Sequence, residues 1–156
     1  MHSQARYLRS GLSNILNVTI LGGRVSELVH ANGYGIFLDE ILGLDQKIRY
    51  AAIFDGKYHA KFKNEIMGFF KEAEIKSSFY EAKNKWISLT QIGFKIGEPR
   101  FTMSQYGKIN RISFPVGKDG IIVVTTDLYI DVNKLVDNIM DIHKTLEYNL
   151  PGFFYR

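Results

Sequence analysis

The chain of 156 residues contains no cysteine. This absence excludes disulfide bonds, thiolate metal ligands and a cysteine nucleophile, and it suits a reducing compartment. The sequence also lacks any apolar run of about 18 residues, the minimum length of a transmembrane helix. We therefore predict a cytoplasmic protein that has no contact with a membrane.

The standard sequence motifs of catalysis are missing as well. There is no Walker phosphate loop, no G-x-S-x-G elbow and no H-E-x-x-H helix. Gly33-Tyr34-Gly35 is a lone G-x-G without a third glycine. Asp137, Asp141 and His143 are close in sequence, but on a helix His143 points away from the two carboxylates. We predict no catalytic residue, no metal site and no cofactor, and hence no enzyme.

The charge of the chain is mildly basic. Lysine and arginine exceed aspartate and glutamate by 20 to 16, which gives a net charge of +4. Lys57, His59, Lys61 and Lys63 alternate along one expected strand, but no aromatic residue lies on the same side of the strand, where single-strand binders usually need one for stacking. We expect a solvated strand face, and a nucleic-acid-associated protein is only a lesser alternative.

Apolar periodicity predicts the first half of the fold. A helix is expected at about 36–44, and Asn32, Gly33 and Gly35 should break or weaken it on the N-terminal side. Residues 48–54 and 57–63 are typical of strands, and the first is apolar on both faces, as in a central strand. Asp55-Gly56 between them indicates a tight hairpin.

The hairpin raises a question of register. A two-residue loop in a type I′ turn requires positive φ at Asp55 and Gly56, and it would pair Ile53 with Tyr58. A longer loop would shift the register and exchange the faces of the second strand. Both registers are compatible with the sequence.

The second half predicts helix, three strands and helix. Five residues spaced by four and three define a helical face: Ile75, Phe79, Ala82, Trp86 and Leu89. Strands follow at 100–106, 108–116 and 120–127, and the β-branched run of the last places it centrally in the sheet. A closing helix runs from an N-cap at Asp131 to about Tyr148.

This order predicts an α+β fold with one five-stranded antiparallel sheet and flanking helices, in the order α-β-β-α-β-β-β-α. We divide the chain into an N-terminal extension (1–34), the folded domain (35–149) and an aromatic C-terminal tail (150–156). Three consecutive aromatic residues in the tail favour its docking on an apolar surface.

Several stretches resemble a known group. "LDQKIRYAAIFDG" and "KIGEPRFTMSQYGKINRISFPVGKDGIIVVTT" look like small archaeal proteins of unknown function with a roadblock-like, profilin-like architecture. The resemblance covers about residues 36–146 and rests on core and turn positions. The group's turn after the first strand usually carries one or two more residues than Asp55-Gly56.

The resemblance implies a function in protein interaction. Roadblock proteins are typically non-enzymatic dimers, often joined through their third strand and second helix, and their partners are often small GTPases. By resemblance, the chain is a homodimeric scaffold or regulatory module. Its dimer interface would include Tyr80, Trp86, Phe101, Met103 and Gln105.

One further function stays open from the residues alone. A five-stranded sheet with flanking helices also serves as a small-molecule sensor domain. A sensor would need a cavity lined by aromatic side chains, with Arg111 or His143 turned inward. The competing interpretations are a cross-strand ion pair for Arg111 and a half-buried, hydrogen-bonded core histidine for His143.

Overall fold

The computed structural model describes residues 25–63, 72–117 and 120–149. In chain order the elements are α2 (Val25–Leu42), β1 (Ile48–Phe54), β2 (Tyr58–Phe62), α3 (Glu72–Thr90), α4 (Gly93–Ile96), β3 (Thr102–Gln105), β4 (Ile109–Val116), β5 (Gly120–Asp127) and α5 (Val132–Asn149). The strands form one antiparallel sheet in the order β2-β1-β5-β4-β3. The predicted class and element order are confirmed, with the short α4 as an addition.

The central strands are those with apolar residues on both faces. β5 occupies the middle of the sheet between β1 and β4, and β1 lies between β5 and β2. Ala51, Ala52 and Ile53 of β1 are fully buried, because helices cover both faces of the sheet here. Both central positions were predicted from the double-sided apolar pattern.

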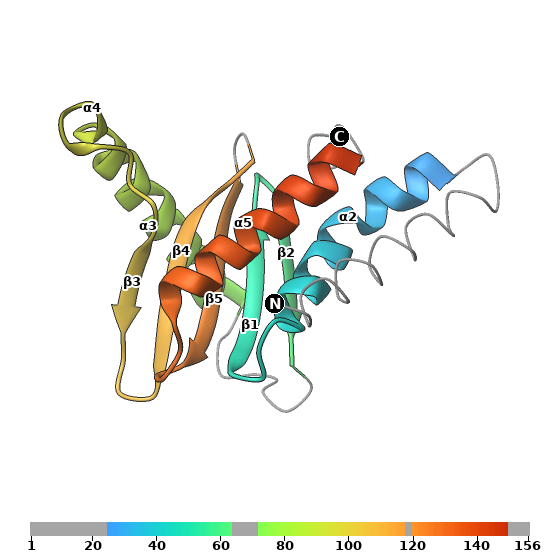
Figure 1. The fold of residues 1–156 in the computed structure, drawn as a ribbon, viewed down its shortest axis with the longest axis horizontal. Coiled ribbons are helices and arrows are strands. Elements are labelled where there is room, and N and C mark those ends of the chain that lie inside the picture. Colours follow the sequence, from blue (N-terminus) through green and yellow to red (C-terminus); the bar gives the residue numbers. More distant parts are fainter. Residues whose placement is uncertain (1–24, 64–71, 118–119, 150–156) are drawn as a thin grey trace.

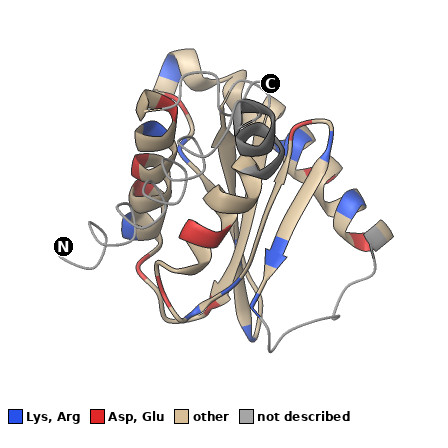
Figure 2. Ribbon diagram, turned by 90° about the vertical axis from the view of Figure 1, so that its right-hand side faces the viewer, with Lys and Arg blue, Asp and Glu red and all other residues tan. Residues whose placement is uncertain are grey.

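Helices lie on both sides of the sheet. α2 and α5 cover one face and contact each other through Phe37 and His143, whose ring centroids are 5.9 Å apart. α3 covers the opposite face, where Phe79 contacts the rings of Phe54 and Tyr58. Figure 2 shows this three-layer arrangement with the sheet between the helices.

The β1–β2 hairpin has a three-residue loop, so the longer of the two loops that the sequence left open is the one that forms. Phe54 pairs with Tyr58, and Ile53 pairs with His59. Only Gly56 has positive φ, at 101°, and Asp55 does not. The register places Tyr58 on the α3 face and His59 on the α2 face, where it stacks on Tyr34 at 4.6 Å.

The predicted break near residues 32–35 is wrong. α2 begins at Val25 and continues through Gly33 and Gly35 without interruption. Gly33 is buried, and a Cβ at Gly35 would lie 3.9 Å from Cε of Lys61 on β2. Each glycine costs a helix about 1 kcal/mol, but the burial of Phe37 and the neighbouring apolar side chains of α2 against the sheet offsets that cost. Packing therefore outweighs the local propensity.

The other helices follow the predicted patterns. The predicted apolar face of α3 packs on the sheet, with Phe79 and Trp86 buried. α5 begins after Asp131, whose carboxylate accepts a hydrogen bond from the backbone N–H of Lys134 at 3.1 Å, as an N-cap does. The division at residues 34 and 35 stays a prediction, and α2 crosses it. The predictions for residues 1–24 and for the 150–156 tail lie outside the described residues.

Candidate protein interface

The exposed side of α3 and the following α4 carries large apolar side chains. Tyr80 and Ile87 are seven residues apart on one face of α3, and each exposes more than half of its surface. α4 and its N-cap add Ile92, Phe94 and Ile96, of which Phe94 is 80% exposed. Figure 1 shows α4 at the end of the molecule, beyond the edge of the sheet. This row of apolar side chains, from Tyr80 to Ile96, is called the α3–α4 stripe below.

β3 forms one free edge of the sheet. It pairs only with β4, from Thr102 opposite Ser113 to Gln105 opposite Asn110. Its outer backbone groups have no strand neighbour within the described chain. An edge of this kind is a template for pairing with a second strand.

The sheet beside this edge is covered unequally. β4 alternates strictly between half-buried and buried residues. Asn110, Ile112 and Phe114 are buried on the side of α2 and α5. Arg111 and Ser113 on the α3 side are only half-buried. α3 therefore leaves the outer part of its own sheet face open for a further contact.

The structure separates the five residues predicted for a dimer interface. Tyr80, Met103 and Gln105 are exposed, and Phe101 is half-buried. Trp86 is only 8% exposed and belongs to the core under α3. Met103 pairs with Ile112 and so lies on the α5 side of β3, across the sheet from Tyr80. The set stays a prediction, but Trp86 offers little surface to a partner.

Sequence reasoning missed most of the α3–α4 stripe. Ile87 follows the core residue Trp86 directly and lies about 100° around the helix from it, on the exposed side. Its spacing of seven from Tyr80 was the available signal. Phe94 and Ile96 lie between Gly93 and Gly97, and this segment is too short to carry a periodic pattern.

Arg100 connects the entry of β3 with α5. Its Nη1 donates to Oδ1 of Asn133 at 2.8 Å, its Nη2 donates to the carbonyl of Asn133 at 3.2 Å, and the guanidinium also pairs with Asp137. The same group lies 5.9 Å from the ring of Phe101. A planar guanidinium with several acceptors fixes orientation well. Asp137 on the polar face of α5 thus helps to anchor the β3 edge.

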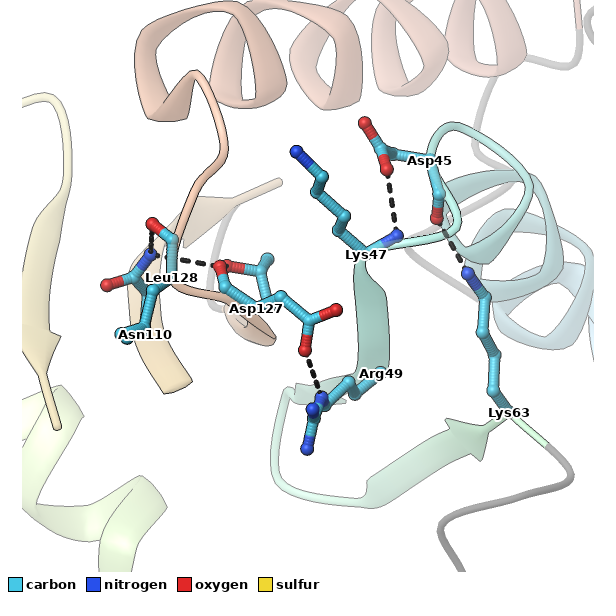
Figure 3. Close-up of polar contacts among 8 residues, drawn as sticks. Asp45, Lys47, Arg49, Lys63, Asn110, Asp127 and Leu128 are labelled. Atoms are coloured by element: carbon cyan, nitrogen blue, oxygen red, sulfur yellow. Dashed lines mark hydrogen bonds and ion pairs between the residues drawn. The ribbon is translucent and has the colours of Figure 1, made fainter. Parts of the chain in front are cut away.

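A polar cluster closes the end of the sheet where β1 begins and β5 ends (Figure 3). Nε of Arg49 lies 2.5 Å from Oδ1 of Asp127, and Nζ of Lys63 donates to the carbonyl of Asp45 at 2.6 Å. Nζ of Lys47 donates to the carbonyl of Tyr129 at 2.5 Å. Partial burial lowers the pKa of Lys63 against the opposing effect of Asp45 and Asp127. Each of the three cations has an acceptor, so the cluster holds strands together.

The basic strand predicted as a solvated face is partly covered by α2, while Lys57 and Lys61 stay exposed. Nζ of Lys61 lies 3.7 Å from a carboxylate oxygen of Asp39, and the imidazole of His59 stacks on Tyr34. The hydroxyl of Tyr34 also donates to Asp55 at 2.5 Å, which ties the hairpin turn to α2. These contacts reduce the open basic surface on which nucleic-acid binding would depend.

Arg111 and His143 do not line a common cavity. Arg111 lies on the α3 side of β4 between Ser104 and Thr125, so the predicted cross-strand ion pair has no carboxylate opposite it. His143 is buried on the other side of the sheet beside Phe37, and burial lowers its pKa. The two residues therefore lie on opposite sides of the sheet, so a single cavity could be lined by one of them but not by both.

Two features that the described residues lack bear on broader classes of function. Within residues 25–63, 72–117 and 120–149, no group of three His, Asp or Glu side chains has the arrangement of metal ligands. In the same part of the chain, no helix combines the length and the apolar character needed to span a bilayer.

Comparisons with known proteins agree on the fold. No family model and no curated protein matches the sequence. Among solved structures, the Roadblock/LC7 domain from Streptomyces avermitilis matches with a TM-score of 0.56 at 11% identity, covering 73% of this chain and 94% of that chain. The chain has the Roadblock/LC7 fold.

Other roadblock-fold structures match to a similar degree. The gliding protein MglB from Thermus thermophilus gives a TM-score of 0.55 at 12% identity, over 77% of this chain and 89% of that one. MglB from Myxococcus xanthus gives 0.54 at 12% identity, over 74% and 93%. These source organisms are bacteria, so the comparisons do not support the archaeal origin that the sequence resemblance suggested.

Proposed function

We propose that this roadblock-fold chain is a non-catalytic, dimeric interaction module that scaffolds or regulates a protein partner such as a small GTPase in the cytoplasm. Two copies would meet through the β3 edge and the α3–α4 stripe. The observation that carries the proposal is the coincidence of a free sheet edge with an exposed apolar helix face on the same side of the molecule.

The size of the apolar surface supports a stable dimer. The stripe and β3 with its following turn expose seven large apolar side chains: Tyr80, Ile87, Ile92, Phe94, Ile96, Met103 and Tyr106. A large aromatic side chain contributes on the order of 150–250 Å² when fully buried, and a standard interface buries about 800 Å² per partner. These seven side chains, each roughly half exposed or more, supply most of the area that one partner must bury.

The open sheet face gives the second copy a place to pack. If two β3 strands pair antiparallel, the two sheets become continuous and each α3 lies near the half-covered face of the other β4. A matched structure of this fold is described as MglB with tetrameric arrangement, which supports self-association as a use of the fold. A small GTPase as partner rests on the roadblock resemblance alone.

Sedimentation equilibrium of the full chain tests the dimer. We expect a mass of twice 17.9 kDa at tens of micromolar. Ile87→Glu together with Met103→Glu should convert most of the protein to monomer, because two charges would be buried in the joined surface. A matched control is Tyr148→Glu, which changes a side chain that is 86% exposed on α5, outside the stripe.

Two results would contradict the dimer. One is a clean monomer of the wild-type chain at tens of micromolar. The other is an equal loss of dimer in the Tyr148→Glu control. The partner is tested by affinity capture from native cytosol with mass identification, and a set of partners without a small GTPase contradicts that part of the proposal.

A further inference from the structure

A shallow groove lies between the β1–β2 turn and α3. It has a volume of about 470 Å³ and is a surface groove rather than an enclosed cavity. Six residues line it: Phe54, Gly56, Lys57, Tyr58, Lys76 and Tyr80. None of the predicted site residues except Tyr80 belongs to it. Its size falls in the range of ordinary ligand sites.

The walls of the groove combine aromatic rings with positive charge. The rings of Phe54 and Tyr80 are 5.7 Å apart, so the aromatic side chains form a continuous surface. One lysine comes from the turn and the other from α3, so positive charge flanks the aromatic surface on two elements. Such a site suits an apolar group that is accompanied by negative charge.

The nearest acidic side chain of the turn is directed elsewhere. Asp55 accepts the hydroxyl of Tyr34 at 2.5 Å and the backbone N–H of Lys57 at 3.1 Å, which engages its carboxylate on the α2 side. Gly56 has open space around the position of a Cβ, so the floor of the turn does not obstruct an approaching chain. The groove thus has two lysines and no carboxylate among its lining residues.

We propose that this groove binds an acidic peptide segment that carries an aromatic side chain, offered by a partner protein. The inference rests on the proposed interaction function and names the chemistry of its partner. The peptide's aromatic ring packs on Phe54 and Tyr58, and its carboxylates lie beside Lys57 and Lys76. An open groove without a glycine-rich phosphate loop favours a peptide over a free nucleotide.

Fluorescence anisotropy of the full chain with a labelled Glu-Glu-Phe-Glu-Glu peptide tests the site. We expect saturable binding that weakens as salt rises. The double variant Lys57→Glu with Lys76→Glu should reduce the affinity at least about tenfold. The matched control is Lys83→Glu with Lys85→Glu, two lysines of the same helix outside the groove, which should change the affinity less than about twofold.

Four outcomes would overturn the proposal. The first is no binding by the wild-type chain. The second is an equal loss of affinity in the control variant, which would show attraction by net charge alone. The third is equal binding of Glu-Glu-Gly-Glu-Glu, which would exclude the aromatic surface. The fourth is tighter binding of GTP or ATP than of the peptide, if the groove variant also loses that nucleotide binding. This result would show that the groove binds a nucleotide rather than a peptide.

Failure of this site can be distinguished from failure of the dimer. The groove variant should retain the sedimentation behaviour of the wild-type chain, because neither lysine belongs to the α3–α4 stripe. A dimer that does not bind the peptide refutes the groove alone. A monomer that binds it refutes the dimer alone. A shift of the Gly56 amide in an NMR titration locates the peptide independently of affinity.

Discussion

Glu40 on α2 is a buried carboxyl group with only 8% of its surface exposed. Its Oε2 is buried and accepts no hydrogen bond from the described residues. Burial raises its pKa from 4.5 to about 7, and the negative charge of Asp39 adds to the effect. Because this pKa is higher in the folded state, the contribution of Glu40 to stability is complete below about pH 4.5. It is lost as the pH rises to about 7.

The variant Glu40→Gln should remove this pH dependence. Glutamine has nearly the same shape and carries no charge, so it avoids the desolvation of a carboxylate. We expect the free energy of unfolding at pH 8 to rise by about 1–2 kcal/mol, and to change little at pH 4.5. Urea denaturation at the two pH values measures the difference.

Glu81→Gln is the matched control for that experiment. Glu81 is exposed on α3, so its replacement should have little effect at either pH. An equal gain for Glu40→Gln at pH 4.5 and pH 8 would show that the carboxylate charge is not the cause.

At the scale of residues, the sequence predicted local roles of side chains better than it predicted which side chains are buried. Asp131 was identified as an N-cap because its side chain acts locally, on the backbone of the next turn. Trp86 was assigned to an interface, but it lies in the core under α3. Whether a residue on an apolar helix face meets its own sheet or a partner depends on how far the sheet extends beneath it.

At the scale of elements, the turn from β4 into β5 depends on Gly120. Gly120 pairs with Val116, and a Cβ at this position would lie 2.6 Å from the carbonyl oxygen of Val116. This oxygen belongs to the backbone of the neighbouring strand and cannot move away without disturbing the pair. The close approach therefore requires glycine at the start of the central strand.

We predict that Gly120→Ala lowers the free energy of unfolding by about 1–3 kcal/mol. Gly107 in the β3–β4 turn provides a control, because a Cβ there meets nothing within 4 Å and the backbone does not have positive φ. Gly107→Ala should be neutral or slightly stabilising. Thermal unfolding followed by circular dichroism compares the two, and similar melting temperatures would contradict the steric argument.

Element order was predictable, but two element boundaries were not. The β1–β2 loop has three residues because β2 must place Tyr58 under α3 and His59 under α2. The Asp55-Gly56 dipeptide alone favours the shorter loop. α2 continues through Gly33 and Gly35 because the burial of its apolar face against the sheet compensates for weak helix propensity. Both outcomes arise where contacts distant in sequence outweigh local preference.

At the scale of the whole molecule, the sheet has an outer edge at β3 that is partly open on its α3 side. The α3–α4 stripe adds exposed apolar surface of a size that single soluble domains rarely leave in water. If the proposed dimer forms, its stability is linked to protein concentration, because association favours the folded state by mass action.

We therefore predict that the melting temperature rises with concentration, by about 3–5 °C for each tenfold increase. Differential scanning fluorimetry from about 1 to 100 micromolar measures this. The Ile87→Glu with Met103→Glu variant should melt at one temperature throughout. A wild-type melting temperature that is independent of concentration over this range would contradict the proposed dimer.

The sequence by itself determined the α+β class, the order of the elements, the central places of β1 and β5 and the roadblock resemblance. These properties follow from apolar periodicity and turn residues, which act over a few neighbours in the chain. Only the tertiary structure decided the hairpin register, the unbroken course of α2, the burial of Trp86 and the exposure of the α3–α4 stripe. The physical reason is that each of these depends on which surfaces meet when elements distant in sequence pack, and one strand or helix does not specify its own neighbours.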